Sequence, residues 1–526
     1  MRALRTATLC IAMFAFAGLA ACSSDDSTDV DADDAASGPT TPDDRESADE
    51  GAGIDRPDGP QPEVTGPLTG GDGVLLLAST PVVLPESWVE EEFRVAGTAT
   101  SYQADGELPA DGHFELTERD TAEYATRVVV RRPADPADFN GTVVVEWFNV
   151  SGGADAAPDF TYVKDEVIRG GYAWIGVSAQ QIGVEGGPVL VGNDLTRAAG
   201  AGQGIKAMDP ERYEDLDHPG DAYAYDIFTQ VARAVRDEAG PVLGDLQAEV
   251  DQVLAIGESQ SGYALTTYIN GFQPQALQFD GFLVHSRGGA SAPLGEPGEG
   301  IALADAIGQP PVTIRTDGPA PVLIVQAEGD MLGILGYHAA RQDDTDTLRL
   351  WEIAGSAHAD AYQIGEAASA LECGAPVNNG PQHFVLKAGL RHLSTWAAGG
   401  DAPPSGEPLN ITDDDTPAVV RDDLGIAEGG VRTPVVDVPV EVLSGEPAEG
   451  ADIMCILFGT TQPIPADVLA QRYESADAYL DDYAEAARAA IDAGFVLEDD
   501  LDELLDWAQP ELLEACPGEI SAAGWR

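Results

Sequence analysis

Positive charge is scarce in this sequence. The 526 residues carry 91 Asp and Glu against 27 Lys and Arg, which gives a formal net charge of −64 at pH 7. Only three residues are lysine, namely Lys164, Lys206 and Lys387. A surface this negative repels nucleic acids and anionic membranes, because like charges raise the energy of close approach. We therefore expect no nucleic-acid partner, and the same repulsion favours a soluble monomer.

Cysteine and metal-binding patterns are also scarce. No CxxC pair or His-rich spacing indicates a structural metal, and the run Asp413–Asp415 lacks the alternating ligand spacing of a calcium loop. We expect neither a metal nor a cofactor. Of the five cysteines, two fall in the leader described below, which leaves Cys373, Cys455 and Cys516. An exported protein meets an oxidising compartment, so we expect one disulfide among these three, with the pair left open.

Long apolar runs are confined to the start of the chain. Arg2 and Arg5 precede an apolar run over residues 9–20, which is shorter than the roughly 20 residues that span a bilayer. The pattern predicts a signal peptide over residues 1–21. Leu19-Ala20-Ala21-Cys22 resembles the lipobox of bacterial lipoproteins, and this implies an exported protein held in the cell envelope by a lipid on Cys22. The alternative is an ordinary signal peptide with a chance cysteine.

Residues 22–63 contain Ser, Asp, Thr, Gly and Pro and almost nothing apolar. Such a segment buries too little surface to offset its ordering entropy, so we expect a disordered acidic tether. Membrane contact is then expected only through the lipid anchor. The remaining residues suffice for one large domain with insertions or for two domains.

Strand-like and helix-like patterns alternate along the body of the chain. Residues 64–133 are β-like, and further strands are expected at 142–147, 172–177, 253–256, 281–285, 321–325 and 348–353. Helices are expected at 160–169, 222–237, 332–341 and 383–398, with another from the Gly257 turn to about residue 270. This alternation predicts an α/β fold, with a mostly parallel, doubly wound sheet and an antiparallel N-terminal edge.

Two regions follow from this pattern. We expect the α/β core over residues 64–400 and a C-terminal extension over residues 401–526 that packs on the core. The extension shows a β-like run at 431–443 and a polar helical tail at 466–515.

A short motif marks a candidate nucleophile. Ser259 lies in Gly257-Glu258-Ser259-Gln260-Ser261-Gly262, after an apolar strand and before a helix, which is the context of a nucleophile elbow. Gly257 fits the first small-residue position of such an elbow, whereas Ser261 stands at the second position instead of glycine. Taking Ser261 as the nucleophile would place Ser259 where a glycine is expected, so we prefer Ser259.

A serine nucleophile needs a base and a group that orients the base. Asp330 falls where the chain leaves the strand at 321–325, and Glu328, two residues earlier, is the alternative acid. His358 follows the strand at 348–353 in a loop of small residues. The order Ser259, Asp330, His358 is the one in which triads of this kind of fold occur.

Hydrolysis also needs donors for the oxyanion. One expected donor is the backbone N–H of Gln260, at the start of the helix. The second is expected from the loop at 148–153, whose glycines let the backbone approach a ligand, with Asn149 as the candidate. The turn at 285–289 either lines the pocket or forms a packed turn.

Several runs resemble a known family. They are residues 141–150, 218–223, 257–262 and 429–434, and they are similar to exported bacterial α/β-hydrolase domain proteins related in pattern to carboxylesterases. The resemblance extends from about residue 64 to residue 507, and the spacing of residues 259–262 is also similar to esterases that act on sugar-linked acids. The family resemblance implies the α/β-hydrolase fold and the activity of a serine hydrolase.

We therefore expect an enzyme that cleaves a small-molecule carboxylic ester through an acyl-enzyme. One alternative is a non-catalytic envelope lipoprotein that uses the fold as a binding module. Another is peptidase, lactonase or acyltransferase chemistry on the same three residues.

Overall fold

A computed structural model describes residues 56–76, 82–192, 194–452 and 454–514. The predicted signal peptide, the predicted lipidation site Cys22, most of the predicted tether and Cys516 lie outside these residues. Within the described part of the chain, no helix is both long enough and apolar enough to cross a membrane.

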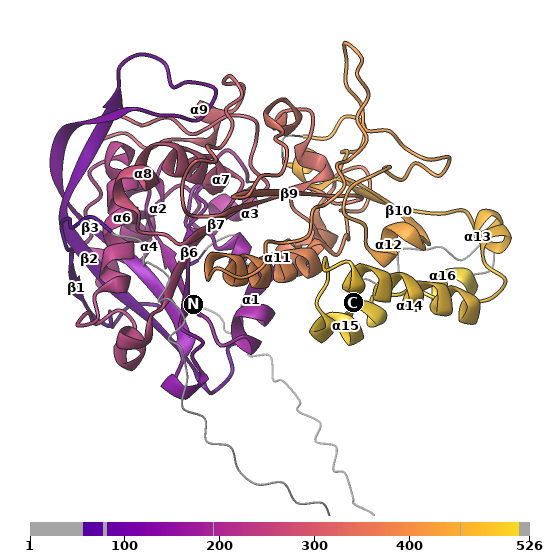
Figure 1. Cartoon of the computed structure of the whole chain (residues 1–526), viewed down its shortest axis with the longest axis horizontal. Coiled ribbons are helices and arrows are strands. Elements are labelled where there is room, and N and C mark those ends of the chain that lie inside the picture. Colours follow the sequence, from indigo (N-terminus) through magenta and orange to yellow (C-terminus); the bar gives the residue numbers. More distant parts are fainter. Residues whose placement is uncertain (1–55, 77–81, 193, 453, 515–526) are drawn as a thin grey trace, which may run out of the picture. The chain divides into compact units, whose positions relative to one another are not determined.

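A nine-stranded sheet forms the centre of the molecule, with strand order β1-β2-β3-β5-β4-β6-β7-β8-β9 (Figure 1). The first three strands and the β3–β5 pair are antiparallel, and all later neighbours are parallel. This confirms the predicted mostly parallel sheet with an antiparallel N-terminal edge. The strands are β1 (Glu63–Thr65), β2 (Trp88–Ala104), β3 (Leu116–Pro133), β4 (Thr142–Trp147), β5 (Ala173–Val177), β6 (Gln252–Glu258), β7 (Gly281–His285), β8 (Val322–Ala327) and β9 (Leu348–Ile353).

Helices cover both faces of this sheet, as a parallel sheet requires. In β4, Val143 and Val145 pack on one side while Val144 packs on the other, because successive side chains of a strand point to opposite faces. Helices α6 (Ala224–Arg236) and α7 (Gln260–Thr267) pack on the first face. Helices α1 (Pro158–Arg169) and α11 (Gln382–Ala397) lie together on the second (Figure 1).

Short helices occupy the connections. They are α2 (Gln181–Glu185), α3 (Asp194–Ala198), α4 (Ile205–Met208), α5 (Pro210–Tyr213), α8 (Gln273–Ala276), α9 (Leu303–Ala306) and α10 (Ala361–Ile364), with a π-helical turn over Tyr268–Phe272 after α7.

Two predicted elements are wrong. The helix expected at 332–341 is only a 3-10 turn over Tyr337–Ala340, because Gly333 and Gly336 adopt φ of 66° and 58°, which break a right-handed helix. The run at 431–443 is strand only at its end. Pro434 begins helix α12 (Pro434–Asp437), since proline suits the first helical turn, and β10 (Glu441–Ser444) then pairs with β11 (Thr460–Pro463).

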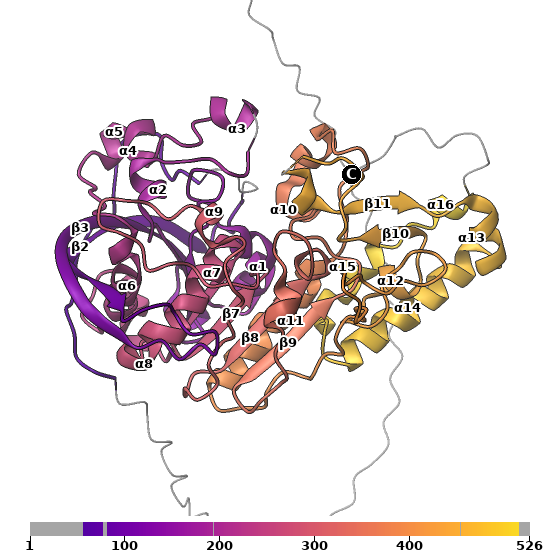
Figure 2. The same cartoon turned by 90° about the horizontal axis from the view of Figure 1, so that it is seen from above.

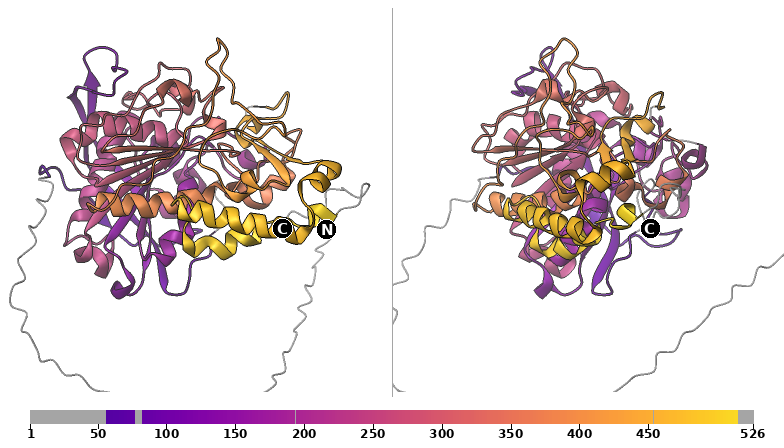
Figure 3. Two further views of the ribbon diagram at one scale, coloured as in Figure 1. Left: turned by 45° about the vertical axis from the view of Figure 1, so that its right-hand side comes forward. Right: turned by 90° about the vertical axis from the view of Figure 1, so that its right-hand side faces the viewer.

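The residues after 400 pack against the core at the β9 edge of the sheet. Figure 2 shows β10 and β11 beyond β9, on the side away from β2 and β3, and Val431 makes an isolated parallel bridge with Ile353 at the end of β9. The tail forms α13 (Ala466–Arg472), α14 (Ala476–Asp492), α15 (Leu501–Asp506) and α16 (Glu511–Glu514). Helices α14 and α15 pack on Phe384 of α11, and buried Lys387 of α11 donates to Asp500 at 2.9 Å. Figure 3 shows the yellow helices of the tail beside the orange helix α11.

A disulfide joins Cys373 to Cys455, with the two Cα atoms 5.3 Å apart. It connects the segment that follows β9 with the C-terminal extension. Of the three pairings that the sequence leaves open, this is therefore the one present.

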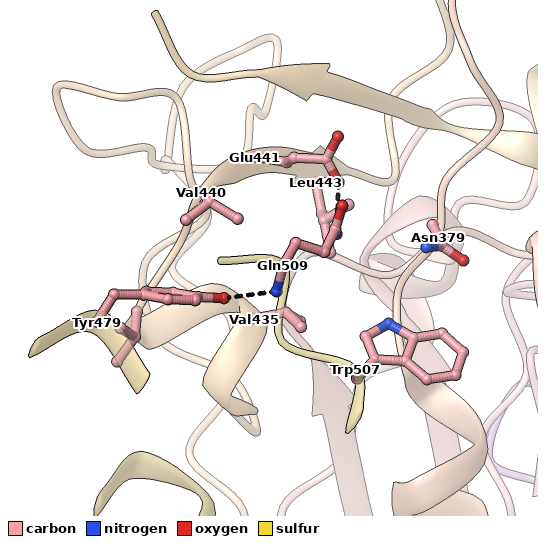
Figure 4. Close-up of a pocket in the computed structure, with 9 residues that line it drawn as sticks. Asn379, Val435, Val440, Glu441, Leu443, Tyr479, Trp507 and Gln509 are labelled. Atoms are coloured by element: carbon pink, nitrogen blue, oxygen red, sulfur yellow. Dashed lines mark hydrogen bonds between the residues drawn. The ribbon is translucent and has the colours of Figure 1, made fainter. Parts of the chain in front are cut away.

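A small cavity lies within the C-terminal extension. It has a volume of about 20 Å³, room for a water molecule. Figure 4 shows Gln509 between Tyr479 and Glu441: its backbone N–H donates to the tyrosine hydroxyl at 3.2 Å and its Nε2 to the carboxylate at 3.0 Å. Neither Ser259 nor His358 lines this cavity, so it is not the predicted site.

Candidate active site

The turn between β6 and α7 holds Ser259 in a strained conformation. Its φ of 59° and ψ of −118° lie in a region that L-residues rarely adopt, and the residue is 4% exposed. A Cβ on Gly257 would lie 2.9 Å from Ser261 Cβ, and a Cβ on Gly262 would lie 3.0 Å from His285 O. A side chain at 257 would force a neighbouring atom to shift and one at 262 would be tight, so both positions favour glycine, while the position expected to be glycine accommodates Ser261.

The structure brings together three residues that the sequence predicted. Ser259 Oγ lies 2.8 Å from His358 Nε2, and His358 Nδ1 lies 2.7 Å from Asp330 Oδ1. The other carboxylate oxygen of Asp330 accepts from the backbone N–H of Ala327 at 2.6 Å. Because a carboxylate accepts, Nδ1 of His358 carries the proton and Nε2 is free to accept from the serine hydroxyl.

The alternative acid, Glu328, does not contact His358. Its carboxylate accepts instead from Arg421 Nη2 at 2.6 Å and from the backbone N–H groups of Gly355 and Gly445 at 2.8 and 3.0 Å. Of the two acids proposed from the sequence, Asp330 is the one that bonds to the histidine.

The two predicted oxyanion donors differ in the hydrogen bonds that they already make. The backbone N–H of Gln260 is the first of α7, so it has no carbonyl of its own helix to bond. The backbone N–H of Asn149 is occupied, since it donates to Ala156 O at 3.0 Å, and its side-chain Nδ2 donates to Glu258 O at 3.1 Å. Asn149 could thus offer only its second Nδ2 hydrogen, and the second donor stays a prediction.

Residues 64–506 match the protein family described as "Alpha/beta hydrolase domain". The chain belongs to this family. The α/β-hydrolase fold and the α/β-hydrolase family predicted from the sequence are thereby confirmed.

Solved structures that match part of this chain include several hydrolases. A dienelactone hydrolase described as putative, from Klebsiella pneumoniae, is 16% identical, with 49% of this chain and 85% of that chain covered and a TM-score of 0.25. An esterase from Rhizomucor miehei is 10% identical, covering 58% and 85%, with a TM-score of 0.29. A glucuronoyl esterase from Solibacter usitatus is 12% identical, covering 56% and 81%, with a TM-score of 0.27. These values carry no information about the substrate. The comparison with curated proteins gave no match.

A chain of oriented amides in this α/β-hydrolase leads from a buried carboxylate to the elbow. Asp221 accepts from Gln180 Nε2 at 2.9 Å, so Gln180 Oε1 faces the other way and accepts from Gln260 Nε2 and from Trp147 Nε1. The orientation of Gln260 is fixed in turn, and its Oε1 accepts from the backbone N–H of Val150 at 3.2 Å. The carboxylate therefore determines which way both amides point.

Sequence reasoning missed Gln180 and Asp221 as parts of the site. The run 218–223 stood out as part of the family pattern, but nothing in it showed what Asp221 would contact. Burial raises the pKa of Asp221, and the donors Gln181 N–H, Gln180 Nε2 and Ile301 N–H oppose that shift.

Acidic side chains are also buried beneath the elbow. Burial, and then the nearby charge of Asp159, raise the pKa of Glu146, and burial raises the pKa of Asp159 and of Glu258. Asp159 Oδ1 lies 2.9 Å from Nδ1 of His285, whose pKa burial lowers to about 3. His285 is thus neutral and fully buried, and its backbone carbonyl accepts from Ser259 N–H at 2.9 Å. Of the two interpretations of the turn at 285–289, the packed turn fits His285.

In the described residues, no group of three or more His, Cys, Asp or Glu side chains is arranged to hold a metal ion.

Proposed function

We propose that this protein is a serine hydrolase that cleaves a small-molecule carboxylic ester through an acyl-enzyme on Ser259. The observation that carries the proposal is the pair of hydrogen bonds that joins Ser259 Oγ to His358 and His358 to Asp330, at 2.8 and 2.7 Å. A serine hydroxyl is a weak nucleophile alone, and a histidine that accepts its proton activates it.

The proposed reaction has two steps, acylation and deacylation, and the same groups act in both. His358 Nε2 takes the proton of Ser259 as Oγ attacks the ester carbonyl carbon, and Asp330 stabilises the imidazolium that forms. The Gln260 N–H and a second donor bind the oxyanion. The imidazolium then protonates the departing alcohol and leaves an acyl-serine. Water, deprotonated by His358, attacks the acyl carbon, and the proton returns to Ser259 as the acid departs.

A fluorophosphonate probe tests the nucleophile directly. The full-length protein should be labelled, and the labelled peptide should contain Ser259. The Ser259→Ala and His358→Ala variants should lose both labelling and turnover of p-nitrophenyl esters, while retaining the circular dichroism spectrum of the wild type. Folded protein that is not labelled, and whose background turnover equals that of His358→Ala, would support a non-catalytic binding module instead.

The bond that is cleaved requires a separate comparison. Matched ester, amide and lactone substrates with the same acyl group should give the highest kcat/KM for the ester. A higher value for the amide or the lactone, or transfer of the acyl group to an added alcohol in preference to water, would favour the corresponding alternative activity on the same three residues.

We also propose that the chain is exported and anchored in the cell envelope through a lipid on Cys22. The proposal rests on the lipobox-like residues alone, since Cys22 lies outside the described residues. The protein should incorporate a radiolabelled fatty acid and fractionate with membranes. Replacement Cys22→Ser should abolish both, and an unlabelled wild-type protein would contradict the anchor.

A further inference from the structure

Glu328 connects three segments of the chain that are distant in sequence. It lies in the turn after β8, two residues before Asp330, and its side chain is fully buried. It accepts from Gly355 N–H in the loop that leads to His358. From the C-terminal extension it accepts from Arg421, from Ser444 Oγ at 3.2 Å and from Gly445 N–H. One carboxylate therefore binds the acid loop, the histidine loop and the extension at the same time.

The backbones of these segments are also in direct contact. A Cβ added to Gly445 of the extension would lie 2.2 Å from Gly329 N and 2.6 Å from Ser356 O. A Cβ on Gly459 would lie 2.8 Å from Ala357 Cβ, next to His358. No side chain separates the extension from the loops that carry Asp330 and His358, so a displacement of one displaces the other.

The histidine loop is held by the extension from its far side as well. Ala359 N–H donates to Leu457 O at 3.0 Å. The Nδ2 of Asn378 donates to Gly355 O at 2.9 Å and to Ser444 O at 3.0 Å. The disulfide from Cys373 to Cys455 closes the same contact covalently. These bonds do not involve Glu328, and they fix the extension to the same loop that carries His358.

We propose that the C-terminal extension is a positioning element of the active site. Arg421 pairs with Glu328 and thereby keeps the two loops at the distance at which Asp330 and His358 form their hydrogen bond. The inference rests on the proposed function, because the spacing matters only if His358 and Asp330 act on Ser259. Arg421 touches neither of the reacting groups, so its role is indirect.

The effect should appear in kcat rather than in KM. Displacement of a reacting group by about 1 Å can cost about 10²-fold in rate, because the reacting atoms no longer align. The contacts of Arg421 are with Glu328, Glu446 and the carbonyl of Gly425, which belong to the turn after β8 and to the extension. Removing its charge should therefore misplace the catalytic loops and leave substrate affinity nearly unchanged.

The first test compares two arginines of the extension. Replacement Arg421→Met should lower kcat for a p-nitrophenyl ester by about 10- to 100-fold with KM changed less than about twofold, and slow fluorophosphonate labelling by the same factor. Replacement Arg421→Lys, which keeps the charge, should recover part of the loss. Arg432→Met is the control: Arg432 is likewise paired with a carboxylate of the extension, that of Asp437, and with carbonyls of the extension, and the variant should keep wild-type kcat.

The second test perturbs the contact without removing a charge. Replacement Gly445→Ala should lower kcat as Arg421→Met does, because the added methyl displaces Gly329. Gly318→Ala is its control, since a Cβ there would meet nothing within 4 Å. If both test variants lower the melting temperature but keep wild-type kcat, the extension is only a structural support and the inference is overturned. If the wild type itself shows no Ser259-dependent labelling or turnover, the proposed function fails instead, and the two failures are distinguishable.

Discussion

Replacing Gln180 by Glu is a direct test of the amide chain that leads to the elbow. The change is isosteric and replaces one N–H₂ group by an oxygen. The oxygen that accepts from Gln260 and Trp147 is kept, whereas the other now faces Asp221 Oδ2, which lies 2.9 Å from the present Nε2. Two buried carboxylates at this distance cannot both be ionised, so the pair formed by positions 180 and 221 must share one proton.

This proton makes the stability of the Gln180→Glu variant depend on pH. In the unfolded chain a glutamate carboxyl titrates near 4.3, and in the folded chain the pair releases its shared proton only at a raised apparent pKa. A group whose pKa is raised on folding contributes most below its unfolded pKa, and that contribution is lost as the pH rises. The variant should therefore lose about 1.4 kcal/mol of unfolding free energy, relative to the wild type, for each pH unit between its two pKa values. Between about pH 5 and about pH 8 the loss is at most about 4 kcal/mol.

Urea unfolding, followed by far-UV circular dichroism at the two pH values, measures this difference. Gln181→Glu is a matched control, because that side chain is adjacent in sequence but only half-buried, and its Nε2 donates to Gly298 O at 3.3 Å instead of to Asp221. The control should show little change with pH. A difference between Gln180→Glu and wild type that stays constant from about pH 5 to about pH 8 would refute the placement of Gln180 between Asp221 and Gln260.

Three further predictions follow from individual contacts. Asp330→Asn should lower kcat by up to about 10⁴-fold, because an amide favours the wrong tautomer of His358; a stopped-flow ester assay that shows less than a tenfold loss would contradict the proposed role. Burial raises the pKa of Asp360 to about 7, so wild-type stability is lost as the pH rises from about 4 to about 7. The unfolding free energy of Asp360→Asn, measured by urea titration, should therefore rise relative to the wild type by up to about 4 kcal/mol over this range, and a difference that does not change with pH would contradict the raised pKa. Cys455→Ser opens a loop of 82 residues and should cost roughly 4 kcal/mol, with no further loss on adding reductant; unchanged thermal stability would show that the bond to Cys373 does not form in solution.

The parallel strands could be predicted because they are buried on both faces. Strands such as β4 (Thr142–Trp147) and β9 (Leu348–Ile353) are short runs dominated by large apolar and β-branched side chains, which the sequence shows directly. The order of Ser259, Asp330 and His358 could be predicted for a related reason. The carboxyl ends of parallel strands lie at one edge of the sheet, so residues that follow successive strands come together there.

The contacts of the C-terminal extension could not be predicted in the same way. Glu328 and Arg421 are 93 residues apart, and an acidic chain offers many carboxylates with which an arginine could pair. The disulfide pairing could not be predicted either, because it depends on the distance between two loops in space and not on the separation of Cys373 and Cys455 in the sequence. The failed helix at 332–341 has a local cause. Its apolar residues have helical spacing, but the conformation of Gly333 and Gly336 outweighs that periodicity.

The site also shows how a protein with so few cations uses buried acids. Asp330 accepts a hydrogen bond from His358, and Glu328 pairs with Arg421, so both carboxylates have a donor as partner. Burial raises the pKa of four further acids, which favours their neutral form: Glu146, Asp159, Glu258 and Asp360. In the proposed reaction negative charge develops on the substrate carbonyl beside Ser259, and ionised carboxylates under the turn would repel it. Because burial shifts these four acids toward their neutral form, the negative charge that would oppose the reaction is reduced, while Asp330 faces the imidazolium.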